Sequence, residues 1–233
     1  MIKNKIAHLM LQTAYVTLGL IVIVASFGIF EIHEGIRTDF YIHFTNISNY
    51  FAVAVVFIQM ILTIKAIKKG EEGYSNSVRT LKFIGLVCMT ITFLIFNVVL
   101  AGQPNRHEIV IDGTKYIANL PIKDFRVGSI LAHIVLPILY FVDWILFYEH
   151  RKDKWYTPLL TLVLPIAYIA MVYIRAGIML LMKVPMGENM MFPYGFLAFN
   201  NKLLPLILVG FFVGFTAIGY IWFGIDRLIK SKK

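Results

Sequence analysis

Six long apolar runs dominate this chain, at residues 9–30, 45–67, 80–101, 128–148, 157–182 and 203–226. Each run is long enough for a helix to cross a hydrocarbon layer of about 30 Å, because an α-helix rises ~1.5 Å per residue. Backbone N–H and C=O groups find no partners in lipid, so runs of this length must be helical. The sequence therefore predicts an all-α polytopic bundle of six transmembrane helices, with residues 1–233 forming a single domain.

The composition agrees with this class. Hydrophobic residues make up 59% of the chain, the mean hydropathy is +0.76, and the six runs leave no room for a separate soluble domain. The net charge of +9 comes from Lys and Arg at run ends and in short loops, which is typical of membrane topology and lipid contact, not of a nucleic-acid partner. The single cysteine, Cys88, excludes an intramolecular disulfide bond.

The placement of the basic residues also predicts an orientation. The first run is too long for a signal peptide, so we interpret it as an uncleaved span. Lys and Arg are most numerous at both chain ends and in the segments 65–82 and 151–154, which lie on one side of a six-span topology. The positive-inside rule therefore predicts a multi-pass protein of the cell membrane with both termini in the cytoplasm.

Two of the outer loops carry signals of their own. In the loop 102–127, the pair Asp112-Gly113 stands between two β-prone runs, which predicts either a small β-hairpin or an irregular loop. The loop 183–202 is rich in Met, Phe, Pro and Tyr. We expect it to pack into the outer membrane interface or to fold back over the bundle, since a solvated loop would be more polar.

Polar residues from four of the predicted spans fall at one depth, in the outer third of the bilayer. Polar side chains inside a span are costly and are functional candidates by default. Thr45, Ser48 and Asn49 lie on one face of their helix, because they are spaced at i, i+3 and i+4. The layer consists of Thr45, Ser48, Asn49, Asn97, His133 and Arg175.

Each of these residues also has a structural interpretation. Thr45 is placed to start its helix. Ser48, Asn49 and Asn97 are residue types that join helices through hydrogen bonds in membranes. Arg175 can extend to the outer headgroups, and His133 can serve as a buried hydrogen-bonding group. The depth of a residue in the bilayer does not by itself distinguish these structural roles from catalytic or ligand-binding roles.

A hydroxyl group beside an imidazole is the smallest unit of nucleophilic acyl transfer. The imidazole takes the hydroxyl proton and later returns it to the leaving group, while nearby amide or cationic groups stabilise an oxyanion. We predict Thr45 and His133 as the catalytic pair of a lipid-ester hydrolase that needs no metal or cofactor. The predicted substrate-binding or oxyanion-supporting residues are Ser48, Asn49, Asn97 and Arg175.

One ionisable residue lies deeper in a predicted span, and the positions of Lys and His bear on three cofactor classes. Asp143 lies deeper in the fourth run, and we expect it to pair with Lys82 or a hydroxyl group, or to be protonated by desolvation. A retinal Schiff base needs a lysine within the last span, which has none, and bis-histidine haem ligation needs two facing span histidines. A zinc site made by His43, His133 and Glu31 remains an alternative.

Four stretches of the sequence resemble a known family. They read HFTNISNYFAVAVVF, LAHIVLPILYFVDWILF, LPIAYIAMVYIRAG and FPYGFLAFN, and they cover most of the chain from the second run onward. The chain resembles a prokaryotic six-span membrane-protein family that has been described as rhodopsin-like. That family in turn resembles the eukaryotic androgen-induced and androgen-dependent, coagulation-inhibitor-regulating membrane proteins.

The eukaryotic relatives are intramembrane hydrolases with a threonine nucleophile and a histidine, acting on fatty acid esters of hydroxy fatty acids. By motif position, the resemblance implies that Thr45 and His133 are the corresponding pair. The chain departs from the prokaryotic pattern at two positions, where Phe192 replaces a tyrosine and Ala198 replaces an aspartate.

Two functions therefore compete. The first is the intramembrane hydrolase, with membrane lipids as partners and a fatty-acyl ester as substrate. The second is a receptor, channel or transporter without enzymatic activity, in which the same polar layer binds a small or lipidic ligand.

Overall fold

A computed structural model describes residues 4–28, 40–70, 75–100, 104–111, 114–121, 127–183 and 191–229. Within these ranges, six helices are long and apolar enough to cross a membrane, which confirms the predicted bundle. All six predicted runs correspond to them within a few residues. The spans are Lys5–Ser26, Phe44–Lys69, Asn76–Val98, Gly128–Phe147, Thr157–Leu181 and Leu204–Leu228.

The helices begin and end where local chemistry requires. The first helix, α1 (Lys5–Ser26), starts earlier than the apolar run, because the side chain of Asn4 accepts hydrogen bonds from two backbone N–H groups of the first turn. α2 (Phe44–Lys69) ends at Gly70, which adopts the left-handed conformation that glycine tolerates best. Ser75 caps α3 (Asn76–Leu94) through the N–H of Val78.

Two of the spans contain π-helical turns. The third span continues from α3 into η1 (Ile95–Leu100), and the fourth runs through α4 (Val127–Ile130), η2 (Leu131–Val135) and α5 (Leu136–Phe147). π-Turns are rare and occur frequently at functional sites. Both of these turns lie at the level of the predicted polar layer, since η1 contains Asn97 and η2 contains His133.

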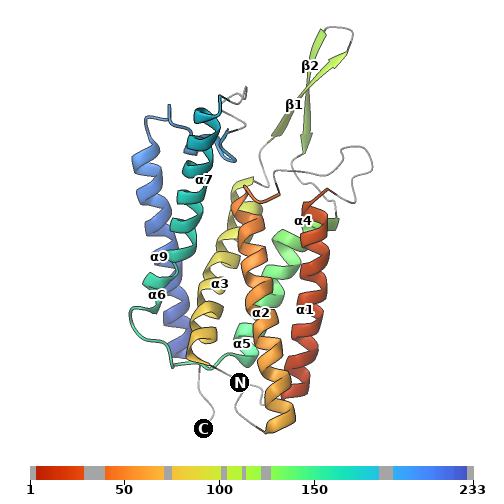
Figure 1. Ribbon diagram of the computed structural model, residues 1–233, viewed down its shortest axis with the longest axis vertical. Helices are drawn as coiled ribbons and strands as arrows, with labels where there is room; N and C mark the ends of the chain where they lie inside the picture. Colours follow the sequence, from red (N-terminus) through yellow and green to blue (C-terminus); the bar gives the residue numbers. More distant parts are fainter. Residues whose placement is uncertain are drawn as a thin grey trace.

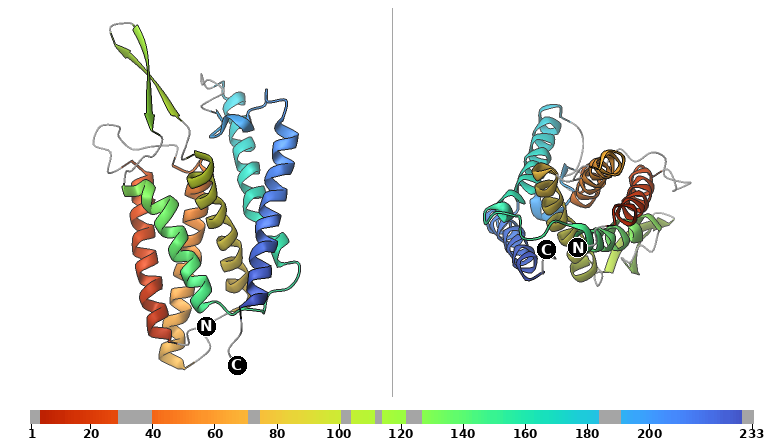
Figure 2. Two further views of the ribbon diagram at one scale, coloured as in Figure 1. Left: turned by 180° about the vertical axis from the view of Figure 1, so that it is seen from behind. Right: turned by 90° about the horizontal axis from the view of Figure 1, so that it is seen from below.

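The last two spans form a pair at one side of the bundle (Figures 1 and 2). The fifth span consists of α6 (Thr157–Leu160) and α7 (Val163–Leu181), and the sixth is α9 (Leu204–Leu228). The helix α9 is the least buried of the six spans, and its buried residues are Phe215, Gly219 and Asp226. Most of its surface therefore faces lipid when the protein is in a membrane.

The core is divided by α3, the most buried span. One cluster of buried side chains joins α1, α2, α3 and α5, and Tyr15, Leu86 and Tyr140 lie in it. A second cluster joins α2, α3, α7 and α9 to the segment around η3 (Gly195–Leu197), with Phe44 and Phe215 among its members. Packing on both faces of α3 makes it the central helix of the fold.

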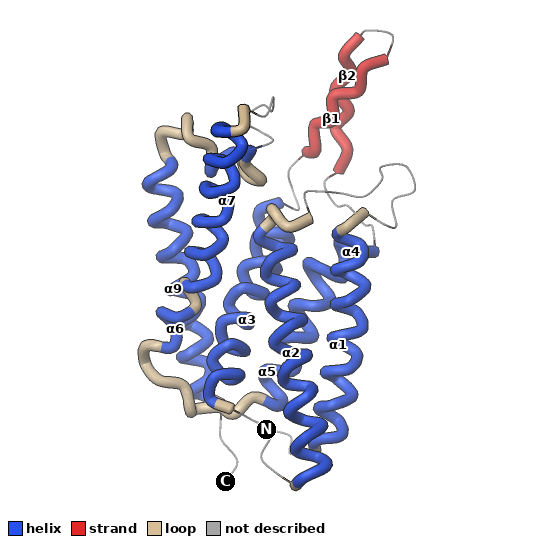
Figure 3. Tube along the Cα trace, in the orientation of Figure 1, coloured by secondary structure: helices blue, strands red, loops and turns tan. Residues whose placement is uncertain are grey.

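The connection between the third and fourth spans contains a two-stranded antiparallel sheet, β1 (Pro104–Ile111) with β2 (Thr114–Pro121). In its register Ile111 pairs with Thr114, so two residues connect the strands. The connecting Asp112-Gly113 pair itself lies outside the described residues. The strands project beyond the helices at the end of the molecule opposite to the chain termini (Figure 3).

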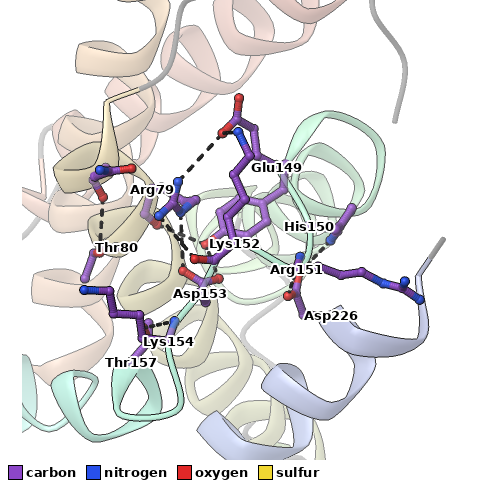
Figure 4. Close-up of polar contacts among 12 residues, drawn as sticks. Arg79, Thr80, Glu149, His150, Arg151, Lys152, Asp153, Lys154, Thr157 and Asp226 are labelled. Carbon is purple, nitrogen blue, oxygen red and sulfur yellow. Dashed lines mark hydrogen bonds and ion pairs between the residues drawn. The ribbon is translucent and has the colours of Figure 1, made fainter. Parts of the chain in front are cut away.

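Polar contacts join the helices at the end where the termini lie (Figure 4). Asp153 accepts a 2.6 Å hydrogen bond from Tyr148 and lies 3.5 Å from Arg79. Burial raises the pKa of the Asp153 carboxyl, against the opposing effects of Tyr148 and Arg79. Asp226 accepts from the ring Nδ1 of His150 at 2.8 Å, which attaches the end of α9 to the connection between α5 and α6.

Candidate functional site

The six predicted site residues lie toward the ends of the spans opposite to the chain termini, at the level of the two π-turns. Thr45 lies in the first turn of α2, and Ser48 and Asn49 are fully buried one turn further on. Asn97 and His133 lie in η1 and η2, and Arg175 is near the C-terminal end of α7.

Asn49 connects the backbones that carry Thr45 and His133. Its amide nitrogen donates a hydrogen bond of 2.8 Å to the carbonyl of Thr45 and one of 3.3 Å to the carbonyl of Ala132, the neighbour of His133. The two carbonyl oxygens are thus no farther apart than two hydrogen-bond lengths. The amide oxygen of Asn49 is buried without a protein partner among the described residues. The two predicted catalytic positions therefore belong to one region of the bundle.

The other polar groups of the layer join helices. The hydroxyl of Ser48 lies 2.8 Å from that of Thr92, which links α2 to α3. The amide nitrogen of Asn97 donates to the carbonyl of Phe93 at 2.8 Å and contacts the carbonyl of His133 at 3.5 Å. These contacts correspond to the structural interpretation of both residues.

The contacts of His133 define which nitrogen carries its proton. Ring Nδ1 lies 2.8 Å from the carbonyl oxygen of Ser129, and a carbonyl can only accept, so Nδ1 is the donor. In the neutral ring, Nε2 is then the basic nitrogen, and this is the tautomer that a general base uses. The ring also stacks on Phe96, with 3.9 Å between the ring centroids.

The hydroxyl of Thr45 contacts Tyr194. The phenol oxygen of Tyr194 lies at the start of α2 and interacts with the backbone N–H groups of Phe44 and Thr45 and with the Thr45 side chain. His43, the N-cap residue, makes no capping hydrogen bond with its side chain, and Tyr194 lies beside these backbone groups. Burial raises the pKa of Tyr194, which keeps the phenol neutral.

A loop from the last part of the chain brings Tyr194 to this position. Arg175 donates a 2.7 Å hydrogen bond from Nη1 to the carbonyl of Met191, so it anchors this loop. Phe192 and Leu197, which belong to this loop, are buried in the cluster that joins α2, α3, α7 and α9. Residues 191–202, the described part of the loop beyond Lys183, thus pack against the bundle, one of the two arrangements expected from the apolar sequence. Arg175 also contacts the Tyr41 hydroxyl at 3.4 Å.

Replacing Tyr194 with Phe is expected to free the Thr45 hydroxyl and the first N–H groups of α2. Losing a capping partner costs about 1 kcal/mol of stability, so the variant should remain folded. Because Thr45 is the nucleophile predicted from the sequence, we expect an electrophilic probe to label it faster in this variant than in the wild type. Labelling rates measured by in-gel fluorescence check this, with Tyr156→Phe, at an exposed tyrosine at the other end, as control. An unchanged rate would contradict a blocking role for Tyr194.

A second polar cluster lies toward the other end of the bundle. Lys82 pairs with the carboxylate of Asp143, which confirms one of the partners expected for Asp143. His8 also contacts Asp143, at 2.9 Å, and Lys82 donates to Gln59 at 3.2 Å. His8 was not predicted as a partner of Asp143, because it precedes the first apolar run of the sequence. The i, i+4 spacing of His8 and Gln12 could have revealed it.

The structure defines the class of this protein as a multi-pass integral membrane protein with six helical spans. Among the described residues, no group of three His, Cys, Asp or Glu side chains could hold a metal ion. Glu31, a member of the alternative zinc site, lies outside the described residues. No protein-family model, curated protein or solved structure matches the chain.

Proposed function

We propose that the protein is an intramembrane hydrolase of lipid esters, with its active centre at the outer polar layer. Thr45 is the nucleophile and His133 the general base. The observation that carries the proposal is the double hydrogen bond of Asn49, which ties together the two backbone segments that present these side chains.

In the proposed reaction, Thr45 Oγ1 attacks the ester carbonyl carbon while Nε2 of His133 takes the hydroxyl proton. The tetrahedral intermediate collapses, the bond to the alcohol breaks, and His133 returns the proton to the leaving alkoxide. A water molecule, deprotonated by His133, then hydrolyses the acyl group from Thr45. The Nδ1 hydrogen bond to Ser129 supports this assignment, because it leaves Nε2 as the proton acceptor.

The start of α2 supplies the electrostatic part of the proposal. The phenol of Tyr194 lies beside the backbone N–H groups of Phe44 and Thr45 and interacts with them electrostatically. Free N–H groups at a helix start favour negative charge, so an ester oxygen in that place would be stabilised as an oxyanion. The proposal therefore requires substrate to displace Tyr194 and Thr45 to turn toward His133.

An apolar surface beside this position suits an acyl chain. A shallow, open hollow lined by Phe196, Ile207 and Phe211 lies at the outer end of α9. Phe196 stacks on Tyr194 with 5.2 Å between the ring centroids, so the hollow borders the oxyanion position. We therefore propose fatty-acyl esters as the substrate class, with the chain in the hollow and the ester beside Thr45.

The resemblance to the androgen-induced and androgen-dependent hydrolases supports the same pair of residues. The topology belongs to the proposal as well, with both termini in the cytoplasm of a cell-membrane protein and the active centre near the outer leaflet.

A non-enzymatic protein that binds a lipidic ligand is the second candidate. It is favoured by the present contacts, in which the Thr45 hydroxyl meets Tyr194 and the His133 ring lies between Ser129 and Phe96. In that case the polar layer would recognise a lipid head without forming a covalent bond.

A fluorophosphonate probe separates the two candidates, since it reacts covalently with activated hydroxyl groups. We expect the wild-type protein in detergent micelles or nanodiscs to be labelled, Thr45→Ala to lose the label entirely, and Thr45→Ser to retain it. Mass spectrometry of the digested protein should place the adduct on Thr45.

Ser48→Ala is the matched control, because Ser48 lies on the same helix face but is fully buried. It should be labelled like the wild type. Full labelling of Thr45→Ala, or loss of the label in Ser48→Ala alone, would reject Thr45 as the nucleophile. A wild type that binds fatty-acyl esters reversibly without being labelled would favour the second candidate.

A further inference from the structure

Polar side chains from four helices meet toward the end of the bundle where the termini lie, well away from the predicted polar layer. Each of them is at least nine-tenths buried. Polar groups are costly inside a membrane span, so each of them needs a hydrogen-bonding partner. The cluster consists of His8, Gln12 and Tyr15 from α1, Gln59 from α2, Lys82 from α3 and Asp143 from α5.

One part of this cluster is satisfied within the protein. The ammonium group of Lys82 contacts Oδ2 of Asp143 and donates to Oε1 of Gln59 at 3.2 Å. Nε2 of His8 forms a 3.0 Å hydrogen bond with the amide nitrogen of Gln12. An amide nitrogen can only donate, so Nε2 of His8 accepts. It therefore has no proton to offer to Oδ1 of Asp143, although that oxygen lies 2.9 Å away.

Three buried oxygen atoms of the cluster have no protein partner among the described residues. They are the amide oxygen of Gln12, the hydroxyl of Tyr15 and Oδ1 of Asp143. The three residues are 0%, 1% and 3% exposed, so bulk solvent does not reach them. A buried polar atom without a partner costs the full desolvation penalty of its group, and native proteins commonly satisfy such atoms with bound water.

The three oxygen atoms belong to one region between α1 and α5. Gln12 and Tyr15 are three residues apart and lie on the same face of α1. The amide of Gln12 and Oδ1 of Asp143 both contact Nε2 of His8, so they are separated by no more than two hydrogen-bond lengths. The phenol of Tyr15 is close enough to Asp143 to interact with its charge.

The hydrogen-bonding capacities of the three atoms match those of one water molecule. The oxygens of Gln12 and Asp143 can only accept, whereas the Tyr15 hydroxyl can donate. A water molecule has two protons to donate and can accept in return, and a buried water typically makes about three hydrogen bonds. A neutral ligand also fits the charge, because Lys82 already balances the carboxylate of Asp143 and would repel a further cation.

We propose that Gln12, Tyr15 and Asp143 form a buried water-binding site. One water molecule donates to Oε1 of Gln12 and Oδ1 of Asp143, accepts from the Tyr15 hydroxyl, and thereby joins α1 to α5. It supplies the hydrogen bond to Oδ1 that His8 does not, so both oxygens of the carboxylate are satisfied beside Lys82. The site lies in a different region from the proposed hydrolase site and does not rest on that function.

Radiolytic hydroxyl-radical footprinting tests the proposal in the intact protein. A synchrotron X-ray pulse generates radicals from bound water as well as from bulk water, so a buried side chain beside a bound water is oxidised. With the protein in lipid nanodiscs, mass spectrometry of the digest should show Tyr15 oxidised several times faster than Tyr168. Tyr168 is the matched control, because it is 3% exposed and its hydroxyl already donates to the carbonyl of Ile42 at 2.8 Å.

A variant and an isotope identify the water as bound at this site. Gln12→Leu removes one of the two acceptors and fills its space with an apolar side chain, so oxidation of Tyr15 should fall to about the level of Tyr168. Thr13→Val, at an exposed position of the same helix, should leave it unchanged. After rapid mixing of the wild type with H₂¹⁸O, Tyr15 should take up the heavy isotope more slowly than the exposed Tyr156.

The wild type alone can overturn the proposal if Gln12→Leu does not fold. Oxidation of Tyr15 no faster than that of Tyr168, or isotope uptake as fast as that of Tyr156, would refute an enclosed water. So would a folded Gln12→Leu with the wild-type rate at Tyr15. Replacing sodium with N-methylglucamine in the buffer should change nothing, and a changed rate at Tyr15 would assign the site to a sodium ion instead. Hydrolase activity is not measured, so failure of either proposal leaves the other intact.

Discussion

Replacing Lys82 with Met is expected to destabilise the folded bundle by about 3–5 kcal/mol, the largest effect on stability that we predict. The ammonium of Lys82 is the counter-charge of Asp143, and both side chains are almost fully buried. Removing one partner leaves a carboxyl group that must remain charged without compensation or take up a proton. Unfolding in mixed detergent micelles of increasing sodium dodecyl sulfate content measures the free energy.

A second variant tests whether the ion pair itself is the cause. The double substitution Lys82→Met, Asp143→Leu should recover most of the lost stability, because an apolar pair of similar volume leaves no buried charge. Lys69→Met, at an exposed position at the end of α2, is the single-site control and should change stability by less than about 0.5 kcal/mol. Equal effects of Lys82→Met and Lys69→Met would show that the buried pair does not contribute.

In the hydrolase that we propose, replacing His133 with Gln is expected to slow ester hydrolysis and probe labelling by a factor of about 10²–10⁴, the range typical for loss of a general base. Glutamine can form a hydrogen bond in the same place but cannot accept a proton. Initial rates of fatty-acyl ester cleavage by the purified protein in nanodiscs measure the effect. Stability should be less affected, because the His133 ring is only partly buried.

Ser129→Ala is the matched control for this substitution. The Nδ1 proton of His133 is held by the backbone carbonyl of Ser129, whereas the Ser129 hydroxyl is 3.4 Å from the same nitrogen. The variant should therefore keep the tautomer and most of the rate. Wild-type rates in His133→Gln would remove His133 from the mechanism, even if Thr45 were still labelled.

The helical bundle could be predicted from the sequence because the hydrophobic pattern of each span extends over many residues. Each span needs about twenty apolar residues, and no single residue decides the outcome. The first span begins four residues earlier than the predicted run, because Asn4 caps the helix there. The polar residues His8 and Gln12 lie on the buried face of that helix, so hydrophobicity did not reveal the early start. The partner of Asp143 was accessible to prediction, because few groups can compensate a buried carboxylate.

The hydrogen-bond partners within the predicted polar layer were less predictable. Counting residues along the spans placed Thr45, Asn49 and His133 at one level, but the partners of each side chain depend on how its helix is rotated about its own axis. The π-turns at Asn97 and His133 change that rotation and have no clear sequence signature. The role of Tyr194 arises from a loop that returns to the bundle from a distant part of the chain, which periodicity does not reveal.

The two π-turns have a consequence for the insertion or deletion of residues. A π-turn holds one residue more than an α-turn, and each residue of an α-helix corresponds to about 100° of rotation. Deleting one residue from Leu131–Val135 would convert that segment to a regular helix and turn the part of the span that carries Ser129 relative to α5. A change in length there would rotate one part of the span relative to the other, and the side chains on the rotated part would then face different neighbours.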